Sequence, residues 1–374
     1  MNFDFSDDQK ELREQAQRFL RDRCTPKAVR NILEGGDTYD RTLWKGVVEM
    51  GWTATVIPEE FGGLGLGYLE LCVIAEELGR VVAPIPFASS VYLATEAILL
   101  AGSAEQKAKY LPKLASGELV GTFAMAEGAG AATPRTVRTT LKSGKLDGTK
   151  VPVADGNVAD FAIVLARTSD DGERSLTLAI VDLKGPGVTR KAVTTIDPTR
   201  DQAEIAFAGA PAEALGGAGD GWSLTRQIQD RAAVLVAFEQ VGGASACLEM
   251  AKDYALNRYA FGRQIASFQA IKHKLADMYV NNEIARSNAY YGAWALSTGS
   301  AELPEAAAGA RVSATQAYDY ASKENIQTHG GMGFTWELDC QLYFRRARTD
   351  GLSLGPARAW KERLVQQLER KNAA

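Results

Sequence analysis

Few side chains in this sequence could carry out acid–base or metal chemistry. The chain has two histidines, which leave little room for a Ser-His-Asp triad, and four widely spaced cysteines that form no CxxC pair. No metal site is therefore expected. The best acid–base candidate is Glu239, because the stretch LVAFEQVGG places its carboxylate among apolar residues, where burial would raise its pKa. The alternative is a partly buried helix glutamate paired to a neighbour.

Three glycine-containing segments have both a structural and a binding interpretation. The Gly-rich turn at residues 62–67 is typical of a structural turn. The pair Gly330-Gly331 after Gln327 is typical of a helix cap, and Arg258 with Phe261-Gly262 is compatible with a helix end that carries a solvated arginine. None of these segments is specific by itself.

Length and composition describe the chain that must position these groups. With 374 residues, 46% hydrophobic and 24% charged, the chain predicts two or three globular domains with cores large enough to need no disulfide staples. The net charge of −4 argues against a nucleic-acid or membrane-surface partner. The acidic N-terminal stretch resembles no signal or transit peptide, and no apolar run approaches the ~18 residues of a membrane span, so a cytoplasmic protein is expected.

The pattern along the chain is helical, then β, then helical. Ser6 predicts the cap of a first helix, further helices are expected before Arg80 and from about residue 104, and residues 212–303 contain no proline, as long helices require. Between them lie the β-type runs FAIVLART, SLTLAIVDL and AEIAFAGAP, with no helices between, which favours an antiparallel barrel or sandwich. No GxGxxG follows a strand, so a doubly wound dinucleotide fold is not expected.

Taken together, the motifs are specific. The chain resembles the acyl-CoA dehydrogenase family over nearly its whole length, in VIPEEFGGLGLG, EELGR, LDGTKVPVADGNVAD, YALNRYAFGRQIASFQAIKHKLADM and QTHGGMGFTWE. The resemblance implies an α+β architecture: an N-terminal helical domain (1–118), a central antiparallel β-barrel (119–222) and a C-terminal four-helix bundle (223–374). The R-x-x-FG…FQ and Q-x-x-GG blocks carry the strongest match.

The resemblance also implies a flavoenzyme. In the family, FAD lies between subunits of a tetramer, the substrate is an acyl-CoA thioester, and electron-transfer flavoprotein takes the electrons. A carboxylate removes the α-proton while the flavin accepts hydride from the β-carbon, which gives a trans-2-enoyl-CoA. The retained blocks imply that the pyrophosphate and adenosine end of a neighbouring subunit's FAD is held by six residues: Arg258, Phe261, Gln269, Gln327, Gly330 and Gly331.

The two segments that hold the flavin ring in the family differ here. A TEPG-x-GSD-like loop is replaced by residues 126–132, which read AEGAGAA. A W-I-T-N-like strand is replaced by residues 152–155, which read PVAD. The hydroxyl and aromatic groups that would bond or cover the isoalloxazine are missing from both segments.

The catalytic base of the family is also missing from its usual position. Leu354 stands where most relatives carry a glutamate, and Ala232 stands where a minority carry it instead. Glu239 lies seven residues further on, about 10 Å along the same helix face, and is the remaining candidate for a relocated base.

Three functions remain open from the sequence. The first is the subunit of a heteromeric acyl-CoA dehydrogenase that pairs with a homologous chain and acts on a bulky acyl-CoA such as a steroid side chain. The second is a self-sufficient homo-oligomeric dehydrogenase with Glu239 as base. The third is a flavin-free structural or binding protein that uses the same scaffold.

Overall fold

The structure is a computed structural model that describes residues 6–35, 37–169 and 172–373. The chain divides into two compact units, each built from separate stretches of sequence. The barrel unit comprises Ile32–Tyr68 and Pro84–Ala232, and the helical unit comprises Met1–Asn31, Leu69–Ala83 and Ala233–Ala374. The domain boundaries expected from the resemblance stay predictions.

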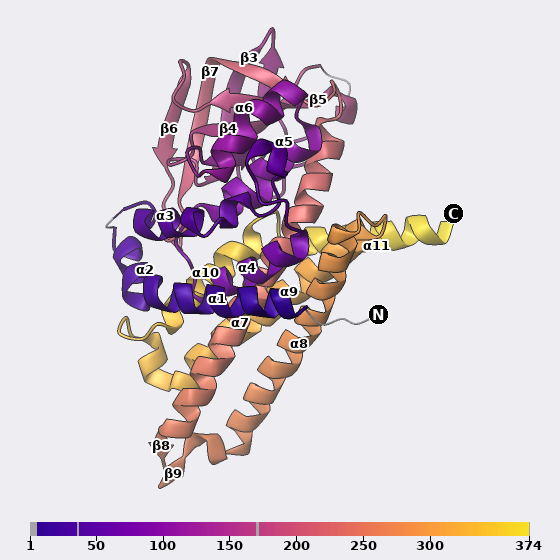
Figure 1. Ribbon diagram of the computed structural model, residues 1–374. Helices are drawn as coiled ribbons and strands as arrows, with labels where there is room; N and C mark the ends of the chain where they lie inside the picture. The colour runs from indigo at the N-terminus through magenta and orange to yellow at the C-terminus, as the bar shows by residue number, and fades with distance from the viewer. Residues whose placement is uncertain (1–5, 36, 170–171, 374) are drawn as a thin grey trace. The chain divides into compact units, whose positions relative to one another are not determined.

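The barrel unit is built on one sheet whose strands are β1 (Gly121–Ala124), β2 (Thr140–Lys142), β3 (Lys145–Ala154), β4 (Phe161–Arg167), β5 (Leu176–Asp182), β6 (Val188–Ala192) and β7 (Gln202–Leu215) (Figure 1). Hydrogen bonding runs from β4 through β2, β3, β7 and β5, and β5 pairs with β4 again, so the sheet closes. β1 pairs with β4 and β6 pairs with β7 outside this path. The β-barrel and all three β-type runs of the sequence are confirmed.

The sequence predicts an antiparallel barrel, but two of the strand pairings are parallel. β1 lies parallel to β4, and β2 meets β4 in a parallel register at Thr140 and Arg167. The reason is topological: the chain leaves β1, forms β2 and β3, and returns to lie beside β1 as β4. The other pairings are antiparallel.

Helices cover one side of this sheet. The barrel unit contains α3 (Arg41–Glu49), a π-helical segment η3 (Ala88–Thr95), α5 (Glu96–Ala101) and α6 (Ala104–Ala115). Ile98 and Leu111 from these helices share one core with Ile163 and Ile180 of the barrel. Because β4 and β5 face this core on one side and the barrel interior on the other, both read as continuous apolar runs.

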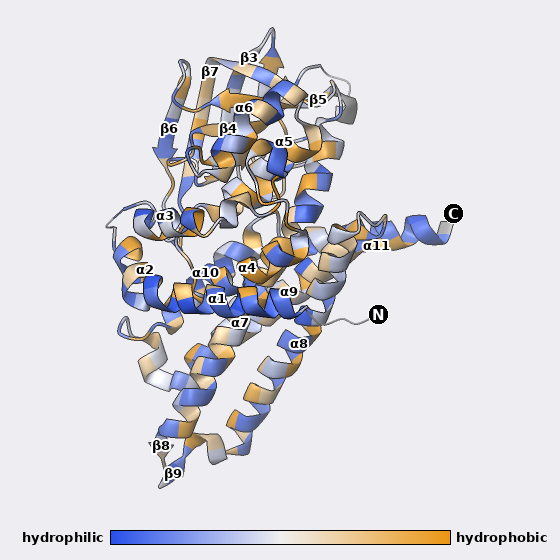
Figure 2. Ribbon diagram, in the orientation of Figure 1, coloured by the Kyte–Doolittle hydropathy of each residue, from blue (hydrophilic) through white to orange (hydrophobic). Residues whose placement is uncertain are grey.

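The helical unit contains α1 (Asp7–Arg23), most of α4 (Tyr68–Arg80), α8 (Gln269–Ser297), α9 (Leu303–His329), α10 (Cys340–Leu352) and α11 (Ala357–Ala373). α2 (Pro26–Leu33) and α7 (Gly221–Asn257) have residues in both units. Ser6 caps α1 through a capping box with Gln9, as predicted. Figure 2 shows α1 as mostly hydrophilic, which fits a helix that buries few of its residues.

α7 and α8 are the long helices that the proline-free stretch predicts. They are joined by the short hairpin of β8 (Tyr259–Ala260) and β9 (Arg263–Gln264), and α8 also packs on α9 (Figure 1). Asn282 of α8 donates to Ser245 of α7 over 2.8 Å.

α7 also packs closely on α4. A Cβ at Gly242 would lie 1.9 Å from the Glu76 carbonyl oxygen, so only glycine lets the two backbones approach this far.

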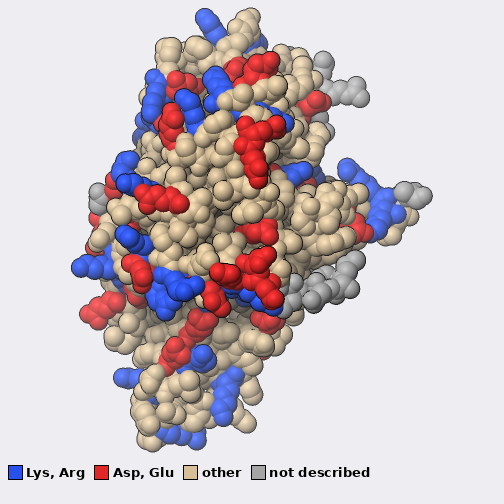
Figure 3. Space-filling model, in the orientation of Figure 1, with Lys and Arg blue, Asp and Glu red and all other residues tan. Residues whose placement is uncertain are grey.

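One expectation about apolar segments needs correction. Among the described residues, α7 contains an apolar stretch long enough to cross a membrane. However, 83% of that stretch is buried inside the protein, as in the core helix of a bundle. Lys and Arg lie beside Asp and Glu over the face in Figure 3, in keeping with the small net charge.

Candidate functional site

The first predicted cofactor block folds as a tight hairpin at the end of α7. Phe261 and Gly262 are its two central residues, with φ of 52° and 76°, as a type I′ turn requires. A positive φ is rare for a phenylalanine, and this side chain is 96% exposed. Its ring meets the Phe268 ring edge-on at 6.3 Å. The fold therefore holds an aromatic ring out in solvent at some conformational cost.

Two polar residues of the same block flank this hairpin. Arg258 follows the last residue of α7 and is exposed, and no side-chain partner of its guanidinium is seen within the described part of the chain. Gln269 is the first residue of α8 and is also exposed. An unpaired guanidinium with five N–H donors is suited to phosphate oxygens.

The second predicted block lies at the end of α9. Gln327 is exposed, and Gly330 ends the helix with φ of 59°, so the cap that the sequence predicts is present. A Cβ at Gly330 or Gly331 would meet no atom within 4 Å. The backbone there is consequently open to a ligand or to another chain.

A ring contact brings the two blocks to the same end of the helical unit. Tyr254, near the end of α7, packs on His329, near the end of α9, with ring centroids 4.2 Å apart. His329 Nδ1 lies 2.8 Å from the Asn325 carbonyl oxygen, which fixes the ring on its own helix. The two blocks thus lie at the same end of the helical unit, and each of the six residues predicted for the pyrophosphate and adenosine end is exposed. We call these six residues the tip.

The first ring-site segment, residues 126–132, is built around Glu127. Its carboxylate accepts from the N–H groups of Arg138 (2.6 Å) and Thr139 (2.9 Å) and from Lys150 Nζ (2.7 Å). Lys150 is fully buried, and burial lowers its pKa to about 8 although Glu127 opposes the shift. Glu127 therefore closes the loop between residues 127 and 139 by its own internal bonds.

The second ring-site segment, residues 152–155, is the end of β3 and the turn after it. Asp155 is buried with φ of 53° and accepts a 2.5 Å hydrogen bond from Ser89 Oγ. Pro152 offers no N–H, and Ala154 offers only a methyl group. The side chains of both segments do not supply the hydroxyl and aromatic groups that a flavin ring has in the family, whereas the tip presents an exposed guanidinium and an open backbone.

The base candidates occupy different surroundings. Glu239, on α7, is 2% exposed. A Cβ at Gly79 of α4 would lie 2.0 Å from the Glu239 carbonyl oxygen, so Glu239 lies where the two helices cross closely. Ala232 is fully buried. Leu354 lies half-buried in the loop between α10 and α11, with φ of 59°.

The loop around Leu354 is held in place by buried groups. Arg311, which is fully buried, donates to the carbonyl oxygens of Asp350 and Ser353 and to Gln240 Oε1. Trp360 Nε1 donates to the Leu354 carbonyl oxygen over 3.1 Å. The loop keeps a defined shape with a leucine where the family has a carboxylate.

Sequence reasoning missed a buried polar cluster in the barrel unit. Tyr68 Oη donates to Glu96 Oε2 over 2.9 Å, and Arg231 Nη1 lies 3.7 Å from the same oxygen. These residues are 28 and 163 positions apart in sequence from Tyr68, so no local motif identifies them.

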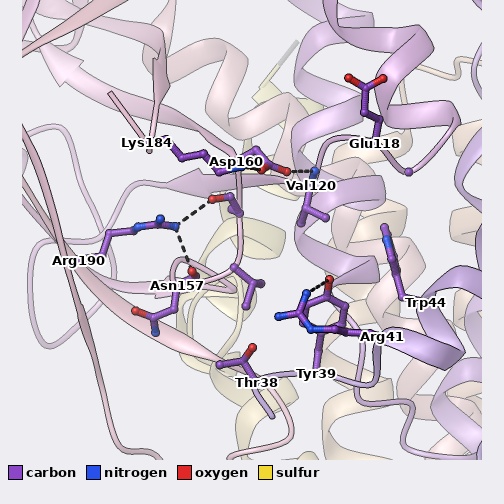
Figure 4. Close-up of a pocket in the computed structure, with 13 residues that line it drawn as sticks. Thr38, Tyr39, Arg41, Trp44, Glu118, Val120, Asn157, Asp160, Lys184 and Arg190 are labelled. Atoms are coloured by element: carbon purple, nitrogen blue, oxygen red, sulfur yellow. Dashed lines mark hydrogen bonds and ion pairs between the residues drawn. The ribbon is translucent and has the colours of Figure 1, made fainter. Parts of the chain in front are cut away.

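A pocket of about 410 Å³ lies in the barrel unit, between α3, the β3–β4 turn and β6 (Figure 4). Its polar groups mostly serve one another. Arg190 donates to the carbonyl oxygens of Asn157 and Ala159, both at 3.0 Å, and Lys184 pairs with Asp160 at 2.6 Å. These bonds explain the polar residues of the pocket by their role in holding the fold.

The comparisons with known proteins agree with this architecture. The family models "Acyl-CoA dehydrogenase, N-terminal domain" and "Acyl-CoA dehydrogenase, C-terminal domain" match residues 6–118 and 219–367. The chain is 34% identical to "Acyl-CoA dehydrogenase IpdE2" of Mycolicibacterium smegmatis, over 97% of this chain and 99% of that protein.

Two solved structures are similar over their full length. One is the ChsE4-ChsE5 complex from Mycobacterium tuberculosis, with a TM-score of 0.88 and 27% identity over 99% of this chain and 99% of the matched chain. The other is a variant of the Tcur3481-Tcur3483 steroid ACAD, with a TM-score of 0.88 and 28% identity over 98% of this chain and 99% of that chain.

The chain belongs to the acyl-CoA dehydrogenase family. It is an FAD-dependent oxidoreductase that acts on acyl-CoA thioesters. FAD supplies the hydride acceptor when it is bound. Family membership decides against the flavin-free alternative, and the sequence-based identification of the family is confirmed.

Proposed function

We propose that this chain is the supporting subunit of a heterotetrameric acyl-CoA dehydrogenase. The observation that carries the proposal is an asymmetry between its two half-sites. The tip keeps the groups that would hold the phosphate end of a neighbour's FAD, and they are exposed and unobstructed. The segments that would hold its own flavin ring lack hydroxyl and aromatic side chains, and position 354 is a leucine.

In this arrangement the tip residues act on the partner's cofactor. Arg258 would hold the pyrophosphate by charge-assisted hydrogen bonds, and the open backbone at Gly330 and Gly331 would let its N–H groups approach. Phe261, Gln269 and Gln327 would complete the contact from the same surface. The homologous partner would supply the ring site and the base.

The proposed substrate is a bulky acyl-CoA of the steroid type, and electron-transfer flavoprotein is the proposed acceptor in the cytoplasm. Support comes from the relatives: one similar structure is a steroid ACAD, and another is a complex of two differently named chains. The acceptor follows the resemblance to the family.

The proposal is tested by purifying the chain alone and together with a homologous subunit. We expect little flavin in the chain alone, and both flavin and acyl-CoA turnover when the two are combined. One flavin per subunit in the chain alone, with turnover, would instead establish the self-sufficient homo-oligomer with Glu239 as base.

Glu239→Gln gives a second, independent test. Because we propose that the partner supplies the base, turnover of the assembled enzyme should stay within a few-fold of wild type. If Glu239 is the base, α-proton abstraction should slow by roughly 10²–10⁴-fold with flavin still bound. Asp230→Asn, earlier on the same helix, is the matched control. Single-turnover flavin reduction by acyl-CoA is the measurement.

A further inference from the structure

The second cofactor block has a backbone whose shape its own side chains cannot fix. Gly330 ends α9, and Gly331 follows it in the short turn η6 (Gly330–Phe334). A Cβ at either glycine would meet no atom within 4 Å, so packing does not hold this part of the turn. Because two successive glycines can adopt many backbone conformations, the direction of their N–H groups must be set by neighbouring contacts.

Those contacts come from the loop that follows η6, residues 335–339. Thr335 donates to the Met332 carbonyl oxygen twice, from its backbone N–H over 3.0 Å and from its hydroxyl over 2.7 Å. Met332 directly follows Gly331. A shift of Thr335 is therefore passed to the backbone directly after the glycine pair.

The loop is in turn held by Arg30, which lies on α2 near the start of the chain. Arg30 Nη1 donates to the Trp336 carbonyl oxygen over 2.7 Å, and Arg30 Nε donates to Asp339 Oδ1 over 2.9 Å. These contacts span 306 and 309 positions of sequence, and all three residues lie in the helical unit. One guanidinium thus holds the loop at two separate points.

The Trp336 side chain adds a contact to each of two arginines. Its ring centre lies 5.7 Å from the guanidinium carbon of Arg30 and 5.2 Å from that of Arg345, on α10. The Arg30 side chain is only 17% exposed, although Trp336 and Glu337 of the loop are on the surface. Removing most of a guanidinium from water costs free energy. Attaching α2 alone would not require this, because α2 already buries Val29, which is 1% exposed.

We propose that Arg30 is a positioning residue for the FAD that the tip binds. By holding residues 335–339, it keeps the N–H groups of Gly330 and Gly331 in the arrangement that donates to the phosphate oxygens of a neighbouring subunit's FAD. Arg30 does not touch the cofactor in this arrangement and acts only through the loop. The inference rests on the proposed placement of FAD at the tip, and does not depend on which subunit supplies the base.

Titration of the apoenzyme with FAD, after assembly of this chain with the homologous subunit, tests the role of Arg30. Arg30→Ala should raise the Kd for FAD by about 3- to 10-fold, because the loop must then be ordered when the cofactor binds. Once FAD saturates the enzyme, kcat should equal the wild-type value, since Arg30 acts on the phosphate end and not on the reacting ring. Thermal unfolding of the chain alone is recorded as well. A lower Tm with an unchanged Kd would make Arg30 a purely structural residue and overturn the proposal.

Two further substitutions separate positioning from a general loss of stability. Arg30→Lys keeps the charge but presents one nitrogen in place of the planar fork, so its Kd should lie between those of the wild type and Arg30→Ala. Asp339→Asn keeps the shape of the side chain, removes the charge at the other end of the contact, and should also raise the Kd. Combined with Arg30→Ala it should raise the Kd no further, because both changes break one interaction. Asp339→Asn decides the matter if Arg30→Ala does not fold.

The matched control is Arg41→Ala. Arg41 Nε also lies 2.9 Å from an aspartate, Asp37, and its guanidinium carbon lies 4.8 Å from the centre of the Tyr39 ring, but these residues belong to the barrel unit. This variant should bind FAD as the wild type does. An equal rise of the Kd in Arg41→Ala and Arg30→Ala would contradict a specific role for the loop contact.

Comparison with Arg258→Ala distinguishes the two ways in which the inference can fail. Wild-type FAD binding in Arg30→Ala and Asp339→Asn, with weakened binding in Arg258→Ala, overturns the positioning role and leaves the proposed function intact. Wild-type FAD binding in Arg258→Ala as well would show that the tip does not hold the cofactor, and the inference and the proposed function would then fail together.

Discussion

Glu127→Gln should lower the free energy of unfolding of this chain by about 3–5 kcal/mol, because it leaves the buried ammonium of Lys150 without its carboxylate. Lys150 is fully buried, and its partners among the described residues are Glu127 Oε1 and the Met125 carbonyl oxygen, at 2.7 and 3.1 Å. Glutamine keeps the shape and still accepts from one loop N–H. The decrease in the free energy of unfolding therefore measures the effect of the lost charge and not of changed packing.

Urea-induced unfolding at pH 7 and at pH 10 measures this effect. The pKa of Lys150 is about 8 when folded and should fall further in the variant, below the ordinary value near 10.4 of an unfolded chain. Between the folded and the unfolded pKa of Lys150, the unfolded state binds more protons than the folded state, so the free energy of unfolding rises with pH. The stability that the variant loses relative to wild type should therefore be smaller at pH 10 than at pH 7.

Two further variants test the cause. Glu127→Gln combined with Lys150→Met should recover much of the loss, because removing both charges leaves no unpaired ion. The exposed Glu213→Gln should change stability by less than about 0.5 kcal/mol. A deficit that persists unchanged in the double variant would contradict the explanation.

Arg258→Ala should weaken flavin binding in the assembled enzyme by about 10- to 100-fold, the effect of one charge-assisted contact. The side chain is exposed and has no described partner, so thermal stability of the chain itself should not change. The flavin-to-protein ratio after dialysis is the measurement. Arg18→Ala, an exposed arginine on α1, removes the same charge elsewhere and should retain flavin. Full occupancy in Arg258→Ala would refute the placement of the cofactor.

Local patterns in the sequence predicted the elements well. Ser6 caps α1 through a bond that needs only its neighbours, and the absence of proline before Pro304 allowed α7 and α8 to be expected at nearly full length. The family motifs identified the tip, and all six of its residues are exposed in the structure. Their contact with a flavin stays a prediction.

Long-range pairings could not be predicted in this way. The parallel contact of β1 with β4 depends on where the chain returns after β3, which periodicity does not encode. In the sequence Glu127 is one residue of an altered loop, whereas in the structure its carboxylate is the hydrogen-bonding centre of that loop. The trio of Glu96, Tyr68 and Arg231 joins residues from three elements, so its burial is visible only in the folded chain.

The exposure of the tip also bears on which substitutions the protein tolerates. Phe261 is 96% exposed, and the backbone at Gly331 has free space around it, so side chains there contribute little to folding. A variant library at Arg258, Gln269, Gln327 and Gly331 would therefore report mainly on cofactor and subunit recognition, whereas Gly330, with φ of 59°, is best left unchanged.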